Sequence, residues 1–165
     1  MNKQDLLSKI DQRYKHNKEY KNPLLSEETI KTLHRLCCHS DQAGIYRTSD
    51  ALPLGEGHTP PEAKDIAHFM HHFMNQLETS YIMFHPVEFA AIAYKRLLDI
   101  FPFASHNEET ATLFLNLLLA SEGYPVIDSP SHLDGYEKAM EQARIMPFPD
   151  TNPLTVLIAN AILAK

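Results

Sequence analysis

Several features of secreted, membrane-bound or nucleic-acid-binding proteins are missing from this sequence of 165 residues. Its apolar runs are too short to cross a bilayer, and its first residues are polar, without the apolar core of a signal peptide. The two cysteines, Cys37 and Cys38, are adjacent and cannot link distant segments, which favours a reducing, cytoplasmic setting. Positive charge is scarce as well: the formal net charge of −6 argues against binding to nucleic acid or to an anionic membrane.

What is present is the composition of an ordinary folded domain. Hydrophobic residues make up 44% of the chain and charged residues 22%, and no repeat, low-complexity tract or linker divides it. We therefore expect a single domain over residues 1–165, large enough to bury a core. Residues 1–22 are expected to form a polar N-terminal helical extension with only a thin apolar stripe.

Helix signals dominate the rest of the chain and predict an all-α fold. Ser26 is placed to cap one helix, and the dipeptide His85-Pro86 starts another, which Pro102 must disturb. The segment Leu113–Leu119 is apolar almost all round. A helix without a polar face belongs in the middle of a domain, so we expect this one to be central.

A further helix is expected to begin near Thr59-Pro60-Pro61-Glu62, which has the form of a capping box with proline at the first helical position. Its apolar stripe is predicted to face the core and consists of Ile66, Phe69, Met70, Phe73 and Leu77. His68, His71 and His72 fall on the other, solvated face. No carboxylate or cysteine stands at ligand spacing beside them, so we expect no zinc there.

Residues 44–58 have a different character. Ile45–Thr48 is β-prone, and Gly55-Glu56-Gly57 is a turn signal. This segment is predicted to form a short β-hairpin, which we call the flap.

The order of these segments resembles the Fic (Fido) family. The phrases that carry the resemblance cover about residues 26–163 and are Leu33-His34-Arg35, Gly44-Ile45-Tyr46-Arg47, Thr59-Pro60-Pro61, His85-Pro86-Val87-Glu88, Asn116-Leu117-Leu118-Leu119, Gly123-Tyr124-Pro125 and Tyr136-Glu137-Lys138-Ala139. The resemblance implies a Fic-type helical domain with a signature loop over residues 101–112. In the family that loop carries the residues for transfer of a nucleotide to a protein hydroxyl.

The family's loop reads His-x-Phe-x-Asp/Glu-Gly-Asn-Gly-Arg-x-x-Arg, and here it is degenerate. Phe103 and Asn107 match the pattern. The histidine that takes the proton from the target hydroxyl falls on Phe101, and the acidic metal ligand falls on Ser105. Phe101 also continues the apolar stripe of its own helix, so we expect it in the core.

The other departures replace small or positive residues. The family's glycines fall on His106 and Glu108, and its arginines fall on Glu109 and Thr112. Ser105-x-x-Glu108 has the form of a capping box, which would satisfy the helix start with its own side chains. Glu108 and Glu109 suit the positive end of a helix dipole but repel a phosphate. The resemblance thus implies a loop whose frame survives without its chemistry.

Few side chains offer replacement chemistry. His106 is the nearest alternative base and Glu109 the second, but we expect neither to be catalytic, because glutamates at a helix start are usually structural. Asn107 is expected to act as a cap or to orient a bound group. A second cluster of metal-binding residue types is also interpreted as structural, so that no metal is expected: His34, Cys37, Cys38 and His39.

The flap is the best candidate for a binding surface. In the family it lies beside the signature loop, and the target peptide pairs with it as an added strand. Thr48-Ser49-Asp50-Ala51-Leu52 keeps a strand-compatible sequence, although Pro53 limits its length. A peptide-binding site could therefore remain after the catalytic residues have been replaced. The alternative is that the flap is a surface loop without a ligand.

Three functions follow for the whole chain. The first is a Fic-fold protein that has lost adenylyltransferase activity, uses no cofactor, and binds a protein or peptide partner at the flap. The second is a divergent enzyme that modifies a protein hydroxyl or a phosphate ester with ATP and magnesium, with His106 or Glu109 as base. The third is a structural relic or a homo-oligomerising module.

Overall fold

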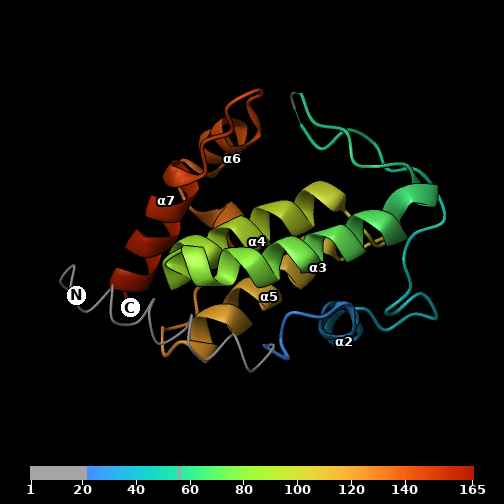
Figure 1. Cartoon of the computed structure of the whole chain (residues 1–165), viewed down its shortest axis with the longest axis horizontal. Helices are drawn as coiled ribbons and strands as arrows, with labels where there is room; N and C mark the ends of the chain where they lie inside the picture. The colour runs from blue at the N-terminus through green and yellow to red at the C-terminus, as the bar shows by residue number, and fades with distance from the viewer. Residues whose placement is uncertain (1–21, 56) are drawn as a thin grey trace.

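The computed structural model describes residues 22–55 and 57–165 (Figure 1). Of the extension predicted over residues 1–22, all but Asn22 lies outside this part. None of the described helices is long and apolar enough to cross a membrane. In chain order the helices, with 3-10 turns labelled η, are α2 (Glu27–Cys37), η1 (Ala63–Asp65), α3 (Ile66–Met83), α4 (Pro86–Ile100), α5 (Asn107–Ser121), η2 (Pro130–His132), α6 (Tyr136–Arg144) and α7 (Asn152–Leu163).

The helix boundaries follow local sequence signals. Ser26 caps α2, its hydroxyl accepting a hydrogen bond from the backbone N–H of Thr29 at 3.1 Å. His85 precedes the proline that opens α4 and accepts from the N–H of Val87 through its ring Nδ1. α4 ends two residues before Pro102, because the residue before a proline is disfavoured in the helical region.

The core is built around α4, which packs against α3, α5 and α7. Its alanines at 90, 91 and 93 are fully buried and let these neighbours approach closely. α3 lies alongside it in Figure 1, as the short connection between the two helices requires. α5, which was expected at the centre, packs against α4 and α2 and leaves Leu113 and Leu117 partly buried. The all-α prediction is confirmed, with the central position shared between α4 and α5.

One predicted core residue of α3 lies outside the core. Ile66, Met70, Phe73 and Leu77 are buried, but Phe69 is 42% exposed. The apolar stripe is wider than the face that α4 covers, so its edge residue is left beside the base of the flap, where it lines a surface hollow.

The predicted β-hairpin is wrong for the described residues of the flap. One isolated bridge joins Gly55 to His58, around a tight turn, and no ladder extends from it. Pro53 has no N–H to donate to a ladder. Asp50 turns instead toward η1, where its Oδ1 accepts from the N–H of Ala63 at 2.7 Å. The carboxylate of Asp50 thus does the capping that Thr59 and Glu62 were expected to do.

Arg47 anchors the start of the flap to the C-terminal end of α4. Its side chain is buried, and it donates from Nε to the carbonyl of Phe101 at 2.6 Å and from Nη2 to the carbonyl of Ile100 at 3.3 Å. Further bonds reach the carbonyls of Ser49 and Pro61. The guanidinium therefore neutralises the negative end of the α4 dipole. Burial lowers the pKa of this guanidinium from its usual value.

We predict that Arg47→Gln lowers the free energy of unfolding by about 3 kcal/mol, because several buried carbonyls lose their donor at once. Urea denaturation measures this. The control is Arg35→Gln, which removes a half-exposed arginine that pairs with Glu28 on α2 and should cost less than about 1 kcal/mol. Equal losses in the two variants would refute the anchoring role of Arg47.

Candidate functional site

The loop between α4 and α5 is closed by a single side chain. Asn107, at the first position of α5, accepts from the N–H of Phe103 through Oδ1 at 2.9 Å. It also donates from Nδ2 to the carbonyl of the same residue at 2.8 Å. Both residues are buried. Both polar atoms of the Asn107 amide bond the backbone of Phe103, so the role of this side chain here is to shape the loop.

A buried histidine joins this loop to α2 and to the start of the flap. His34 stacks on Phe103 with ring centroids 3.8 Å apart and nearly parallel planes. Its Nδ1 accepts from the backbone N–H of Gly44 at 2.9 Å, which leaves the ring proton on Nε2. Nε2 therefore donates to the carbonyl of Ser105 at 3.0 Å. One neutral imidazole thus holds three segments together.

The start of α5 differs from the predicted capping box. The residue before the helix is His106, in the left-handed conformation at φ 59°, and no side chain caps the helix. The hydroxyl of Ser105 pairs with His106 Nδ1 at 2.8 Å. Glu108 points instead to η2 and its approach, accepting hydrogen bonds from Ser129 and Ser131. The capping box is therefore wrong, because a left-handed residue at the cap position directs Ser105 away from the helix.

The two candidate bases lie on the exposed side of the loop. His106 Nε2 is 3.7 Å from the carboxylate of Glu109. Together with Ser105 they make a short row of hydroxyl, imidazole and carboxylate at a helix start whose N–H groups have no side-chain cap. Thr112, one turn further along, is partly buried and approaches Ser129.

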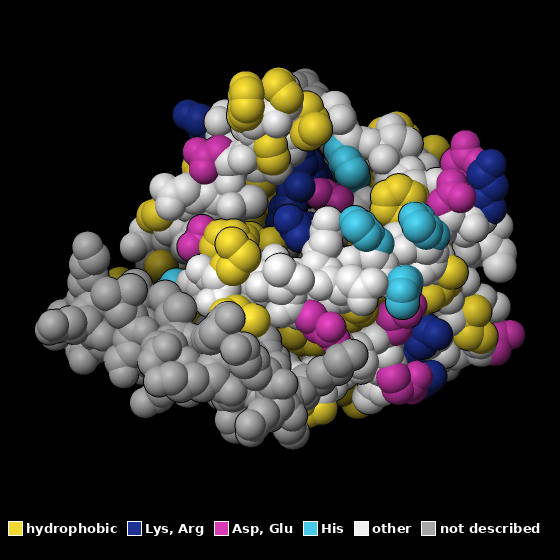
Figure 2. All heavy atoms as spheres, in the orientation of Figure 1, with side chains coloured by type: hydrophobic (Ala, Val, Ile, Leu, Met, Phe, Trp, Pro, Cys, Tyr) yellow, Lys and Arg dark blue, Asp and Glu magenta, His cyan; other side chains and the backbone are white. Residues whose placement is uncertain are grey.

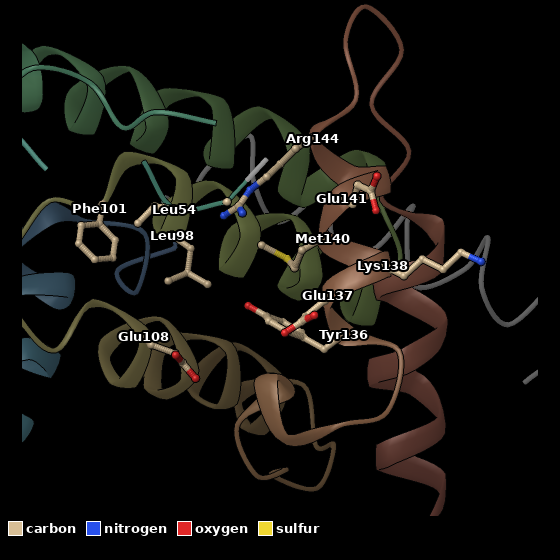
Figure 3. A pocket seen from close by; sticks show the side chains of 11 residues that line it. Leu54, Leu98, Phe101, Glu108, Tyr136, Glu137, Lys138, Met140, Glu141 and Arg144 are labelled. Atoms are coloured by element: carbon tan, nitrogen blue, oxygen red, sulfur yellow. The ribbon is translucent and has the colours of Figure 1, made fainter. Parts of the chain in front are cut away.

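Phe101 was expected in the core, but it lies at the edge of a cleft. It ends α4 in the left-handed conformation at φ 51° and is only partly buried. The cleft has a volume of about 810 Å³ and is walled by the flap, by the ends of α4 and α5, and by α6 (Figure 3). Its lining residues are Leu54, Gly55, Leu98, Phe101, Glu108, Tyr136, Glu137, Lys138, Met140, Glu141 and Arg144.

Arg144, which lines this cleft, belongs to an internal ion-pair network. Arg144 donates from Nε to Asp99 Oδ1 at 2.7 Å, and Lys95 pairs with Oδ2 of the same carboxylate at 2.6 Å. In Figure 2 basic and acidic side chains lie together inside the hollow beside the flap. Lys138 extends away from the cleft in Figure 3. The carboxylate of Glu108 stands on the opposite wall.

The candidate flap residues precede the part of the flap that lines this cleft, and their backbone bends at Thr48 and Ser49. Thr48, Ser49 and Asp50 are exposed, and Leu52 is 83% exposed. Among residues 22–55 and 57–165, no backbone–backbone hydrogen bond involves residues 48–52; the flanking ones run from the N–H of Arg47 to Pro102 and from the N–H of Leu54 to His58. The backbone of residues 48–52 is therefore open to pairing, apart from the Ser49 carbonyl that Arg47 holds.

A group of three ligand-type side chains also meets at the loop: His34, Cys38 and His106 have ligand atoms within 4.8 Å of one another. A hydrogen bond from the Ser40 hydroxyl lowers the pKa of the Cys38 thiol. A metal would nevertheless have to displace His34 from Ser105 and reverse its tautomer against the N–H of Gly44. His68, His71 and His72 form no such group among the described residues. That no metal binds stays a prediction.

Arg47, His34 and the serines that hold Glu108 were not identified as parts of the site from sequence. His34 and Arg47 could have been identified, because they lie in the phrases Leu33-His34-Arg35 and Gly44-Ile45-Tyr46-Arg47 that carry the family resemblance. The pairing of Glu108 with Ser129 and Ser131 had none, because it joins residues more than twenty positions apart.

We predict a pH-dependent stability that arises from His34. Burial lowers its pKa, opposed by the hydrogen bond to Ser105. Below the unfolded-state value of about 6.5, the unfolded chain binds a proton that the folded chain resists, so stability falls as pH falls. The slope is at most about 1.4 kcal/mol per pH unit for this group.

The measurement is urea denaturation of the native protein and of His34→Gln between about pH 7.5 and pH 5. The two proteins differ only at position 34, so the difference between the two profiles isolates His34. We expect the native curve to fall more steeply on acidification. Parallel stability curves for the two proteins would contradict the claim that His34 is buried as a neutral imidazole.

Comparisons with known proteins give a consistent result. The sequence model of the Fic/DOC family matches residues 24–119. The Protein adenylyltransferase Fic of Aedes aegypti is 35% identical over 136 residues, which cover 78% of this chain and 27% of that protein. The Drosophila willistoni protein of the same name is 36% identical over 133 residues, covering 74% and 26%. The chain thus spans about a quarter of the length of these relatives.

Solved structures share the fold. BepC of Bartonella tribocorum, solved with bound AMPPNP, superposes with a TM-score of 0.63 at 17% identity, covering 93% of this chain and 86% of that one. Fic-1 of C. elegans gives a TM-score of 0.65 at 24% identity, covering 94% and 47%.

Proposed function

This chain belongs to the Fic/DOC family, and we propose that it has kept the fold and loop frame, has lost adenylyl transfer, and binds a protein segment at its flap. The observation that carries the proposal is the pair of glutamates in the first turn of α5, the helix that follows the signature loop. Two independent arguments support the loss of adenylyl transfer, and a third supports peptide binding at the flap.

The first argument concerns proton transfer. The resemblance assigns the base to position 101, where the phenyl ring of Phe101 lines the cleft and cannot accept a proton. Loss of a general base typically costs about 10² to 10⁴ in rate. Loss of a transition-state arginine, at the position of Glu109, accounts for about 10³ to 10⁵ in comparable reactions. These factors do not simply multiply, but either one is severe.

The second argument concerns phosphate binding. The uncapped N–H groups of α5 attract an exposed anion by less than about 1 kcal/mol. One carboxylate at about 6 Å repels a phosphate charge by about 3 kcal/mol at an effective dielectric near 20. Glu108 and Glu109 both stand at this helix start, and Arg144 is already paired with Asp99. Repulsion therefore exceeds attraction.

The third argument concerns the flap. An added strand needs free backbone donors and acceptors beside pockets for alternate side chains. Residues 48–52 offer such a backbone, the exposed Leu52 offers apolar contact, and the cleft next to Leu54 offers room for side chains.

Adenylyl transfer is tested by incubating the protein with labelled ATP, magnesium and cell extract. We expect no labelled protein above background. Phe101→His alone should not restore labelling, because the anion site would remain repulsive. Strong labelling by the native protein would overturn the proposal.

The repulsion itself is tested by the double variant Glu108→Gly, Glu109→Arg. We expect calorimetry to detect ATP–magnesium binding by this variant and none by the native protein. The variant should also lose about 0.5–2 kcal/mol of stability, because Ser129 and Ser131 lose their acceptor. Binding by the native protein as tight as by the variant would show that the glutamates do not block the site.

The flap is tested with extended peptides selected against the native protein by display. Leu52→Ala and Ala51→Pro, which remove a side chain and a backbone donor, should weaken binding at least about fivefold, the equivalent of about 1 kcal/mol. Leu36→Ala removes another exposed leucine, on α2, and should leave binding unchanged. Peptides that bind both flap variants as tightly as the native protein would rule out docking at this segment.

A second candidate function rests on the row of Ser105, His106 and Glu109. With the imidazole between a hydroxyl at 2.8 Å and a carboxylate at 3.7 Å, His106 is oriented as a general base would be. This favours modification of a protein hydroxyl or a phosphate ester by altered chemistry, with ATP and magnesium as cosubstrates. Labelling by the native protein that disappears in His106→Ala would support it over the binding module.

A further inference from the structure

A second hollow lies at the base of the flap, between α3 and α4. It has a volume of about 460 Å³ and shares no lining residue with the cleft. Phe69, Phe73 and Pro61 give it apolar walls. Figure 2 shows histidine side chains gathered around exposed hydrophobic side chains on one face, and His68, His71 and His72 of α3 are all exposed.

A polar chain runs along one side of this hollow. Arg96 donates from Nη1 to Gln76 Oε1 at 3.0 Å. The amide nitrogen of Gln76 lies 3.1 Å from His72 Nε2. An amide nitrogen can only donate, so His72 accepts with this atom and keeps its ring proton on Nδ1. These hydrogen bonds therefore fix the orientations of Arg96, Gln76 and His72 relative to one another.

Arg96 has a neutral partner where a carboxylate would be expected. Within the described residues it forms no ion pair, and its hydrogen-bond partner is the amide of Gln76. The acid that acts on it is Asp99, which also lines the hollow but is already bound by Lys95 and Arg144. Partial burial lowers the pKa of Arg96, and the charge of Asp99 opposes this effect without outweighing it.

The unused donors of Arg96 match a specific kind of ligand. A guanidinium carries five N–H groups in a planar fork that fits a carboxylate, and one of its nitrogens serves Gln76. The hollow is large enough for a small organic molecule, and such sites combine apolar walls with a few polar groups that orient the ligand. Phe69, displaced from the core, supplies an aromatic wall that a ligand would cover.

We propose that this hollow is a binding site for a small organic acid, in which an apolar, preferably aromatic body packs on Phe69 and Phe73 and the carboxylate pairs with Arg96. Gln76 holds the guanidinium in place from the protein side. The site is independent of the cleft and of the proposed loss of adenylyl transfer.

The test is a titration of the full chain with 3-phenylpropanoate, followed through backbone amide shifts in ¹H–¹⁵N NMR spectra. The matched neutral probe is 3-phenylpropanamide. Arg96→Gln removes the cation, Phe69→Ala removes the exposed wall, and Arg35→Gln is the control for loss of one positive charge elsewhere. Thermal melts establish that each variant is folded.

We expect saturable shifts at α3 and at His58–Thr59. Binding should weaken at least about tenfold for the amide and for Arg96→Gln, which is the scale of a hydrogen bond to a charged group. Phe69→Ala should weaken it about fivefold, and Arg35→Gln should have no effect. Should Arg96→Gln fail to fold, the comparison of acid with amide on the native protein decides the question.

Three results would overturn the proposal. One is the absence of saturable binding. Another is equal binding of acid and amide, which would make the hollow merely apolar. The third is a shift pattern centred on Tyr136 and Met140, which would place the acid in the cleft.

Discussion

The amide of Asn107 is the interaction on which the rest of the site depends. By bonding both backbone groups of Phe103, it fixes the turn that brings α5 back against α4. Phe103 is then buried against His34, whose neutral ring reaches Gly44 and Ser105. None of these contacts uses the side chains at 101, 105, 108 or 109. The frame of the loop is therefore physically separable from its chemistry, as the proposed loss of adenylyl transfer requires.

The same separation holds on the other side of the cleft. Arg47 binds the carbonyl end of α4, and Arg144 and Lys95 form ion pairs with Asp99. These cations stabilise the walls, and each already faces an acid or the end of a helix. The acids at the α5 start remain exposed. A site with rigid walls and an unfavourable field for anions suits a neutral or backbone-mediated ligand better than a nucleotide, and the open backbone of the flap offers such contacts.

Local signals in the sequence were sufficient for the helices and for the order of segments. Ser26, Pro86 and Pro102 act on their immediate neighbours, so their effect could be predicted from adjacent residues. The errors came from contacts between distant segments. Asp50 caps η1 in place of Thr59, and Glu108 bonds serines near η2 in place of its own helix start. The predicted hairpin failed for the same reason, since the side chains of Arg47 and Asp50 tie the flap to α4 and η1 and no partner strand pairs with its described residues. Phe69 shows that an apolar stripe gives the width of a face but not how much of it a neighbour covers.

The central claim is that the frame persists without nucleotide chemistry, and thermal unfolding of the native protein in ATP and magnesium tests it most directly. A ligand at about 100 times its dissociation constant stabilises the folded state by about 2.7 kcal/mol. For a chain of this size that corresponds to a rise of roughly 5–10 °C in melting temperature. The account predicts a change of less than about 1 °C at millimolar nucleotide. A rise of several degrees, saturating with ATP concentration, would contradict it.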